Sequence, residues 1–272
     1  MAGIFFKNKG QRAGLIIWSA ATGILFLSGQ TPSQDMAGLL DKLSQKIESS
    51  FDYKNWRATI VSTITKTDKN WAPEEVMVVT KNVKSISEGE TQEDILKALQ
   101  TKKGKTTDIT QKYAEERRKE REKSRKRRAE AKTNAPADDE NGGGAMSLDE
   151  FLPFSKKKRG DFEFRRQDRP AAEGEKISAL EVRARVKNPR NWEGTFYFDP
   201  ETYSLKKVDL RPSQNPKMVK ELMMEIEFEA LNDRYLVLKR TLFKVNGGIF
   251  IKHVRQIVEE VYSNFEVLDE KN

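Results

Sequence analysis

The strongest candidate for chemistry in this sequence is a cationic stretch, "KYAEERRKEREKSRKRRAEAK", at residues 112–132. It holds eleven Lys or Arg and five Glu, so it carries +6 of the chain's formal net charge of +8. Guanidinium and ammonium groups at this density can bind phosphate, in nucleic acid or in anionic lipid headgroups. From Glu115 to Lys132 there is no large apolar residue. A helix here has no face to bury, and we expect it to be solvated.

Three interpretations of this stretch compete. The simplest is a solvated helix, supported by Glu-to-Arg pairs one turn apart. The second is contact with anionic lipid headgroups. Nucleic acid is disfavoured, because the interleaved Glu residues weaken the field and Tyr113 is the one aromatic residue available for base stacking. We expect no nucleic-acid partner, and any partner of residues 112–132 to be an anionic membrane surface.

The other chemistry-bearing residue types exclude several enzyme classes. The chain has no Cys and a single His, His253, which rules out disulfides, zinc–thiolate sites, cysteine nucleophiles and multi-His metal sites. His253 lies in "IFIKHVRQIVEEV", which is typical of a strand, and we interpret it as an ordinary sheet residue. No pair of carboxylates has a distinctive spacing. We therefore predict a protein that is not an enzyme and needs no metal or cofactor.

Residues 1–30 have the layout of an export signal. Three cations between Lys7 and Arg12 precede an almost uncharged run, residues 13–29, and a polar stretch follows. A cleaved signal peptide and an uncleaved inner-membrane anchor would both place residues 31–272 in the periplasm, because the positive flank stays inside. The alternative is a buried helix of a cytosolic domain. We expect export.

Hydrophobic periodicity predicts a helix followed by a mostly antiparallel sheet. Residues 35–50 have apolar side chains at helical spacing, with Asp35 as the N-cap. We predict a second, short helix that ends at Gly104 and a third over 108–132. The last hairpin is expected to turn at the Gly pair 247–248. About nine strands are predicted, at residues 53–66, 74–86, 161–168, 176–188, 192–199, 203–213, 218–231, 235–246 and 249–268.

The domain organisation follows from where this pattern is interrupted. We expect residues 31–272 to form one mainly β (α+β) domain with a charged helix and a linker inserted at about 100–147. The linker, residues 133–145, is rich in Pro, Gly, Asn and Asp. Neither a βαβ repeat nor a glycine-rich phosphate loop is visible, which disfavours a nucleotide-binding α/β fold.

Large apolar side chains recur on one side of the predicted strands. The pattern is clearest where Met224, Ile226 and Phe228 alternate with three Glu residues. A strongly curved sheet could fold this side around a helical lid and leave room for an acyl chain; a closed core without a cavity is the alternative. The candidate ligand-binding residues are Phe196, Phe198, Met224, Ile226, Phe228, Leu236 and Leu238.

The order of elements from Trp192 onward resembles a known family. "WEGTFYFDPETYSLKKVDLRPSQNPKMVKELMMEIEFE" contains a Gly, an aromatic strand, an Asp-Pro-x-Thr turn, a second strand, a Pro-rich bend and a long alternating strand. Together with the export signal, the first helix and "YKNWRATIVSTITKTDKNW", this resembles the periplasmic lipoprotein-carrier superfamily, the outer-membrane lipoprotein-sorting or LolA-like proteins.

The resemblance implies an incomplete antiparallel β-barrel with a helical lid and an apolar cavity for acyl chains. It also implies an Arg that latches the lid, for which Arg57 on the first strand is the candidate by position. The expected function is non-catalytic periplasmic binding or carriage of a lipid or a lipidated protein. Two alternatives stay open: an envelope scaffold or sensor without a ligand, and a cytosolic basic RNA-binding protein. The sequence predicts no oligomeric state.

Overall fold

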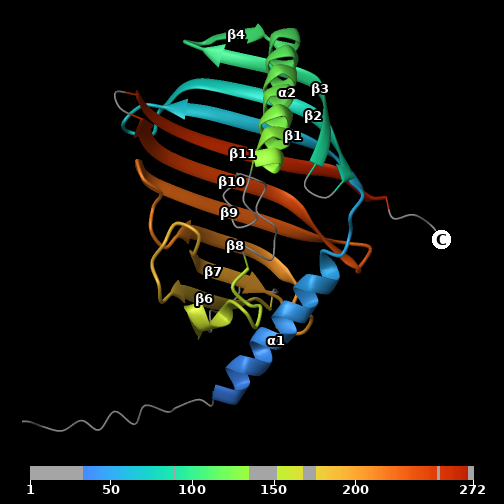
Figure 1. The fold of residues 1–272 in the computed structure, drawn as a ribbon, viewed down its shortest axis with the longest axis vertical. Helices are drawn as coiled ribbons and strands as arrows, with labels where there is room; N and C mark the ends of the chain where they lie inside the picture. Colours follow the sequence, from blue (N-terminus) through green and yellow to red (C-terminus); the bar gives the residue numbers. More distant parts are fainter. Residues whose placement is uncertain (1–32, 88–89, 135–151, 168–175, 250–251, 269–272) are drawn as a thin grey trace, which may run out of the picture.

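One open antiparallel sheet of eleven strands dominates the fold (Figure 1). The computed structural model describes residues 33–87, 90–134, 152–167, 176–249 and 252–268. The strand order is β4-β3-β2-β1-β11-β10-β9-β8-β7-β6-β5. The first and last strands of the chain therefore pair in the middle, and successive neighbours extend the sheet outward on both sides. The predicted mainly β class and antiparallel order are confirmed, with a sheet that is not closed.

The elements have the following bounds. The helices are α1 (Ser33–Ser50) and α2 (Thr110–Asn134), with a short 3-10 helix, η1, at Arg159–Asp161. The strands are β1 (Trp56–Thr67), β2 (Pro73–Ser87), β3 (Glu90–Lys102), β4 (Lys105–Asp108), β5 (Phe162–Gln167), β6 (Ser178–Ala184), β7 (Trp192–Phe198), β8 (Leu205–Pro212), β9 (Val219–Leu231), β10 (Tyr235–Ile249) and β11 (Lys252–Val267).

Strand register shows that both helices lie on the same face of the sheet. Residues directly opposite each other in neighbouring strands point to the same side. α1 packs on the β5–β10 end of one such row, and α2 lies at its β3 end (Figure 1). We call this side the helix face and the opposite side the outer face. The row consists of Leu180, Phe196, Val208, Ile226, Thr241, Glu260, Ser62, Val79 and Ala98.

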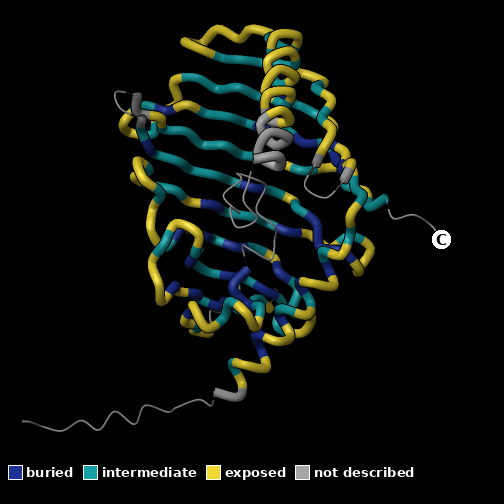
Figure 2. Tube along the Cα trace, in the orientation of Figure 1, coloured by how far each residue is buried: buried dark blue, intermediate teal, exposed yellow. Residues whose placement is uncertain are grey.

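α1 forms as its apolar spacing predicts. Leu39, Leu40, Leu43 and Ile47 recur on one side of the helix and are all buried in the main core. The helix begins at Ser33, so the prediction of Asp35 as N-cap is wrong. The Asp35 carboxylate lies in the first turn, where its negative charge interacts favourably with the helix dipole. Figure 2 shows how burial gathers around α1 and thins out towards β4.

The predicted short helix that ends at Gly104 is wrong, because this segment forms β3. It pairs with β2 from Lys102 opposite Glu75 to Glu90 opposite Ser87, so pairing overrides the helix-forming composition. Gly104 is a hairpin residue: Lys103 and Gly104 both have positive φ and connect β3 to β4, as a two-residue type I′ loop requires. The sequence prediction missed β4.

The turn predicted at Gly247 and Gly248 is also wrong. Both residues are part of β10, where they pair with Val254 and His253. A Cβ on Gly247 would lie 3.1 Å from the backbone oxygen of Met218, so the glycine allows another part of the chain to approach closely. The other predicted strands and the helix over 108–132 are confirmed with small shifts at their ends.

Two predicted segments lie outside the described residues. These are the export signal at 1–30 and most of the linker at 133–145. Neither of the two described α-helices combines the length and apolarity needed to cross a membrane.

Candidate functional site

The structure brings all seven predicted ligand-binding residues together in one apolar cluster on the helix face. Phe196 and Phe198 are fully buried, and Met224, Phe228 and Leu236 nearly so. Ile226 and Leu238 are half-buried at its margin. The cluster packs directly under α1. Most of the predicted site is therefore packed core, and the part that could meet a ligand lies at the margin.

Sequence reasoning missed a segment that completes this core. Leu152, Pro153 and Phe154 are buried, and the Phe154 ring meets that of Phe196 edge-on with centroids 4.8 Å apart. Arg159 holds the segment to α1: its guanidinium donates to the Phe154 carbonyl oxygen at 2.8 Å and to Asp41 Oδ1 at 2.8 Å. The apolar "LPF" in a charged context was the signal that could have indicated it.

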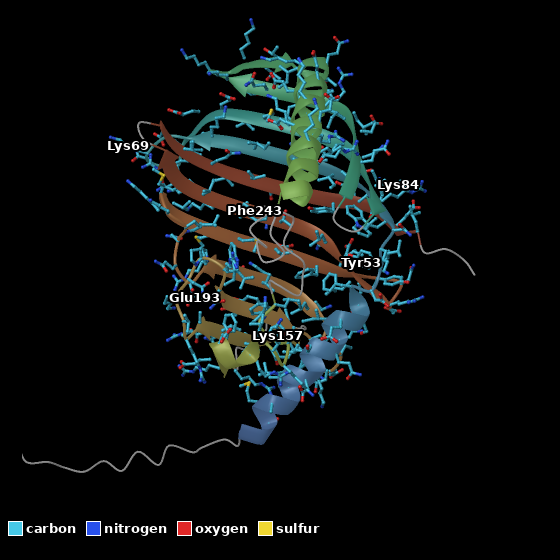
Figure 3. All side chains as sticks on the ribbon, viewed as in Figure 1. Tyr53, Lys69, Lys84, Lys157, Glu193 and Phe243 are labelled. Atoms are coloured by element: carbon cyan, nitrogen blue, oxygen red, sulfur yellow. The ribbon has the colours of Figure 1, made fainter. Side chains whose placement is uncertain are left out.

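The apolar surface of the helix face continues beyond α1. Met224 is opposite Phe243, which is opposite Val258, and the row goes on through Ile64 to Met77 in β2. We call these five residues the apolar strip. Met224 is buried, whereas the other four are only half-buried. Figure 3 shows Phe243 on the part of the sheet between the two helices.

A cluster of charged side chains lies beside the apolar strip on the same face. Glu260 Oε1 accepts a hydrogen bond from Ser62 at 2.7 Å and lies 3.3 Å from Lys81 Nζ. Lys81 Nζ also lies 3.4 Å from Glu93 Oε1, and Tyr262 donates to the other oxygen of Glu260 at 3.0 Å. Burial, and then the charge of Glu260, raise the pKa of Tyr262 above its usual range, so the phenol stays a donor.

α2 joins this cluster through two arginines. Arg117 contacts Glu93 Oε2 at 3.1 Å, and Arg121 donates to the Glu93 backbone oxygen at 3.3 Å. Burial would raise the pKa of Glu93, but Lys81 and Arg117 together outweigh it and lower that pKa. We call Lys81, Glu93, Glu260, Arg117 and Arg121 the charge cluster. The expectation of a fully solvated helix is wrong for the first turns of α2, because a stripe of half-buried residues rests on β3.

The Arg predicted as a lid latch lies elsewhere. Arg57 alternates with the buried Ala58 and forms an exposed ion pair with Glu266, at 2.7 Å. Arg159, by contrast, does bond to α1, through Asp41. The latch role of Arg57 stays a prediction, and Arg159 is the stronger geometric candidate.

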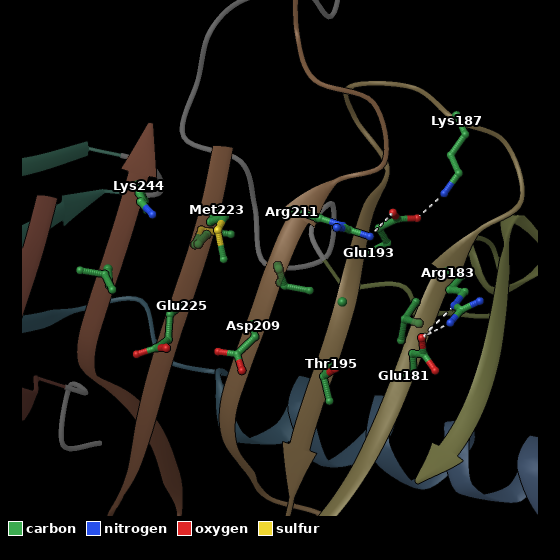
Figure 4. A pocket seen from close by; sticks show the side chains of 15 residues that line it. Glu181, Arg183, Lys187, Glu193, Thr195, Asp209, Arg211, Met223, Glu225 and Lys244 are labelled. Carbon is green, nitrogen blue, oxygen red and sulfur yellow. Dashed lines mark hydrogen bonds and ion pairs between the residues drawn. The ribbon is translucent and has the colours of Figure 1, made fainter. Parts of the chain in front are cut away.

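A groove of about 760 Å³ lies on the outer face of β6–β10 (Figure 4). Its walls are mostly charged and internally paired: Glu193 with Lys187 and Arg211, and Glu181 with Arg183. Apolar side chains, among them Met223 and Leu242, lie between these charged ones, so the lining is mixed. No group of three or more His, Asp or Glu in the described ranges is arranged to hold a metal ion.

Comparison with known proteins gives structural matches alone. No protein-family model and no curated protein matches the chain. Among solved structures, it is similar to a LolA superfamily protein from Nitrosomonas europaea, with 10% identity and a TM-score of 0.37, over 85% of this chain and 94% of the other.

Two further solved structures are similar at the same level. One is a putative outer membrane lipoprotein-sorting protein domain from Vibrio parahaemolyticus, with 9% identity and a TM-score of 0.37, over 86% of this chain and 93% of the other. The other is a DUF1329 family protein from Desulfovibrio piger, with 8% identity and a TM-score of 0.36, over 89% and 95%. The descriptions of two of these three structures name the family that the sequence resembles.

Proposed function

We propose that this chain binds a lipid, or the acyl chain of a lipidated protein, on its helix face without catalysing a reaction, and that it does so after export to the periplasm. The apolar strip is the observation that carries the proposal. Phe243, Val258, Ile64 and Met77 lie on the face that both helices use, yet they remain half-buried. Each methylene group that leaves water against such a surface contributes about 0.8 kcal/mol.

The strip has the position that an acyl site needs. It begins at the buried Met224, next to the core under α1, and crosses four further strands towards the side of the sheet that carries α2. A chain laid across it would be bounded by packed core at one end and by the charge cluster on one side. No step in this proposal requires a catalytic group or a cofactor.

A matched pair of substitutions on one strand tests the proposal. Val258 and Val261 are both in β11, but they point to opposite faces of the sheet. Val258 lies on the apolar strip. Val261 is opposite Arg240 and Val61 on the outer face and is 44% exposed. The full chain and the variants Val258→Asp and Val261→Asp would be produced in a bacterial host and examined by native mass spectrometry, followed by organic extraction. Circular dichroism would verify folding.

The wild type and Val261→Asp should carry co-purifying lipid or take up a fluorescent fatty acid, and Val258→Asp should lose at least tenfold in affinity. A wild-type chain that is empty and takes up no fatty acid would contradict the proposal. The scaffold interpretation would then hold, and the tight packing of Phe196 and Phe198 already favours a closed core under α1.

A further inference from the structure

The apolar strip is a single residue wide where it crosses β11 and β1. Side chains two positions apart along a strand lie on the same face, and on both strands the helix-face neighbours of the strip residue are polar on either side. They are Gln256 and Glu260 beside Val258, and Ser62 and Lys66 beside Ile64. In β10 and β2 one such neighbour is polar: Thr241 beside Phe243, and Glu75 beside Met77. The apolar surface open to a ligand is therefore confined to one row of side chains.

Bonds among the polar neighbours hold both flanks of the strip in place. On one flank, Glu260 accepts a hydrogen bond from Ser62 at 2.7 Å. On the other, Glu75 Oε1 accepts from Lys66 Nζ and from Gln100 Nε2, each at 2.8 Å. These two bonds lower the pKa of Glu75 to about 2, so the carboxylate is charged at neutral pH. A second acyl chain beside the first would have to cover these polar groups, which is unfavourable.

The two ends of the strip differ. Beyond Met224 the row continues to Leu210 in β8, which is 3% exposed and belongs to the main core, so the strip is closed there. Beyond Met77 the row continues to Gln100 in β3 and Thr107 in β4, at the edge of the sheet. Both residues are polar, and Thr107 is exposed. A bound chain can therefore place its methyl end at Met224 and its head group at the β3–β4 edge.

The length of the strip follows from the spacing of the strands. Its five residues lie on five adjacent strands, and four spacings of about 4.8 Å give roughly 19 Å. In an extended hydrocarbon chain, C–C bonds of about 1.5 Å at angles near 111° advance roughly 1.25 Å per carbon. The strip therefore has room for about 15 carbons. This is the length of a long acyl chain, such as a myristoyl or palmitoyl group.

From these observations we infer that the helix face binds one long acyl chain, laid across the strands, and selects its length. The methyl end stops at Met224, and Gln100 marks the point beyond which further methylene groups gain no apolar contact. The polar flanks exclude a second chain. The inference rests on the proposed function and names the class of ligand more closely, as a molecule that presents a single long acyl chain.

A series of chain lengths separates the inference from the proposed function. Saturated fatty acids from octanoic to behenic acid would compete with cis-parinaric acid bound to the full chain, and displacement would be followed by fluorescence. The affinity should rise about fourfold per methylene group and level off near myristic and palmitic acid. A rise without a plateau, or two acids bound per chain in native mass spectrometry, would overturn the inference and leave the proposed function standing. Binding of no acid would overturn the proposed function itself.

Substitutions at the open end of the strip test whether Gln100 sets the limit. Gln100→Leu adds one strand, about 4.8 Å, to the apolar row and should move the plateau to acids longer by about four carbons. Met77→Gln removes one strand and should move it to shorter acids by the same amount. Val78→Gln is the matched control, because Val78 is the next residue of β2 and points to the outer face. A plateau that neither strip variant moves, although circular dichroism shows both folded, would contradict the inference. An equal shift in Val78→Gln would do the same.

Discussion

α1 and α2 lie on the same face of one sheet, but different interactions hold them there: apolar burial for α1 and ion pairs for α2. α1 contributes Leu39, Leu40, Leu43 and Ile47, which are at most 8% exposed, to a continuous core. α2 contributes Arg117 and Arg121, which are each 34% exposed, to ion pairs with one glutamate of the sheet, Glu93. Fully burying a Leu or Ile side chain contributes about 1.5 to 3 kcal/mol, whereas an exposed ion pair contributes about 0 to 1.

The α1 half of the molecule is therefore held by contacts that change little with solution conditions, whereas the α2 half is held by contacts that depend on salt and pH. Apolar burial is non-directional and barely depends on salt, so the α1 half should stay closed over a wide range of conditions. Ion pairs near the surface weaken as salt rises and as carboxylates are protonated. We therefore expect any movement that admits a ligand to the helix face to involve α2 and not α1.

The largest effect should come from a cavity under α1. Leu43 is fully buried between the helix and the sheet. Leu43→Ala should lower the free energy of unfolding by about 2 to 5 kcal/mol, because it loses both transfer energy and packing. Urea denaturation measures this loss. Leu96→Ala in β3 is the control, since Leu96 is 49% exposed and should change stability by no more than about 0.5 kcal/mol. Equal effects would mean that the two halves do not differ as described.

Gly194 in β7 gives the next largest expected effect. Its φ is +153°, and an added Cβ would lie 1.9 Å from the backbone oxygen of Asp209. Gly194→Ala should therefore cost about 1 to 3 kcal/mol or more in backbone strain, measured by thermal unfolding. Gly38→Ala provides a control of opposite sign. Gly38 lies within α1 with open space around it, so Ala should stabilise by about 0.5 to 1 kcal/mol. A neutral Gly194→Ala would show that β7 and β8 can shift apart.

The two halves were also unequally predictable from the sequence. The α1 stripe and the alternation of Met224, Ile226 and Phe228 are local periodic signals, and both gave the correct element and the correct buried side. β3 was predicted as a helix because its composition favours one; only the neighbouring β2 strand, a tertiary partner, decides the matter. Hydrophobic periodicity describes one segment at a time and does not indicate which edge of a sheet will pair with a further strand.

The charge cluster could not be predicted for a related reason. Lys81, Glu93, Arg117 and Glu260 lie on four different elements, and the two glutamates are more than 160 residues apart in the chain. Each residue alone is an ordinary charge in a chain that is 34% charged. Register across β3, β2, β1 and β11 is what brings them together. The lack of large apolar residues from Glu115 to Lys132 correctly predicted that α2 buries no apolar face, but it does not indicate whether the arginines of the helix contact the sheet.

Protonation of Glu93 should release α2 while α1 stays docked. The pKa of Glu93 lies below its ordinary value of 4.5, so its contribution is fully present above that pH and is lost as the pH falls through the lower folded value. Cysteines introduced at Arg118 and Lys84 would carry spin labels for pulsed distance measurements, since the chain has no native Cys. The distance should change in acid. In Glu93→Gln the change should already be present at pH 7, and an unchanged distance in both cases would refute electrostatic docking.

The smallest effects distinguish two arginines as possible latches of α1. Arg57 and Glu266 are both at least half exposed, so Arg57→Ala should change stability by less than about 0.5 kcal/mol and leave hydrogen exchange in α1 unaltered. Arg159 is mostly buried and joins α1 to the Phe154 carbonyl. Arg159→Ala should cost about 1 to 2 kcal/mol and increase exchange within α1, because the carbonyl loses a charged donor. The reverse order would restore Arg57 as the latch that the sequence resemblance implies. It would also place control of α1 at the outer ion pair with Glu266 instead of at the buried "LPF" segment.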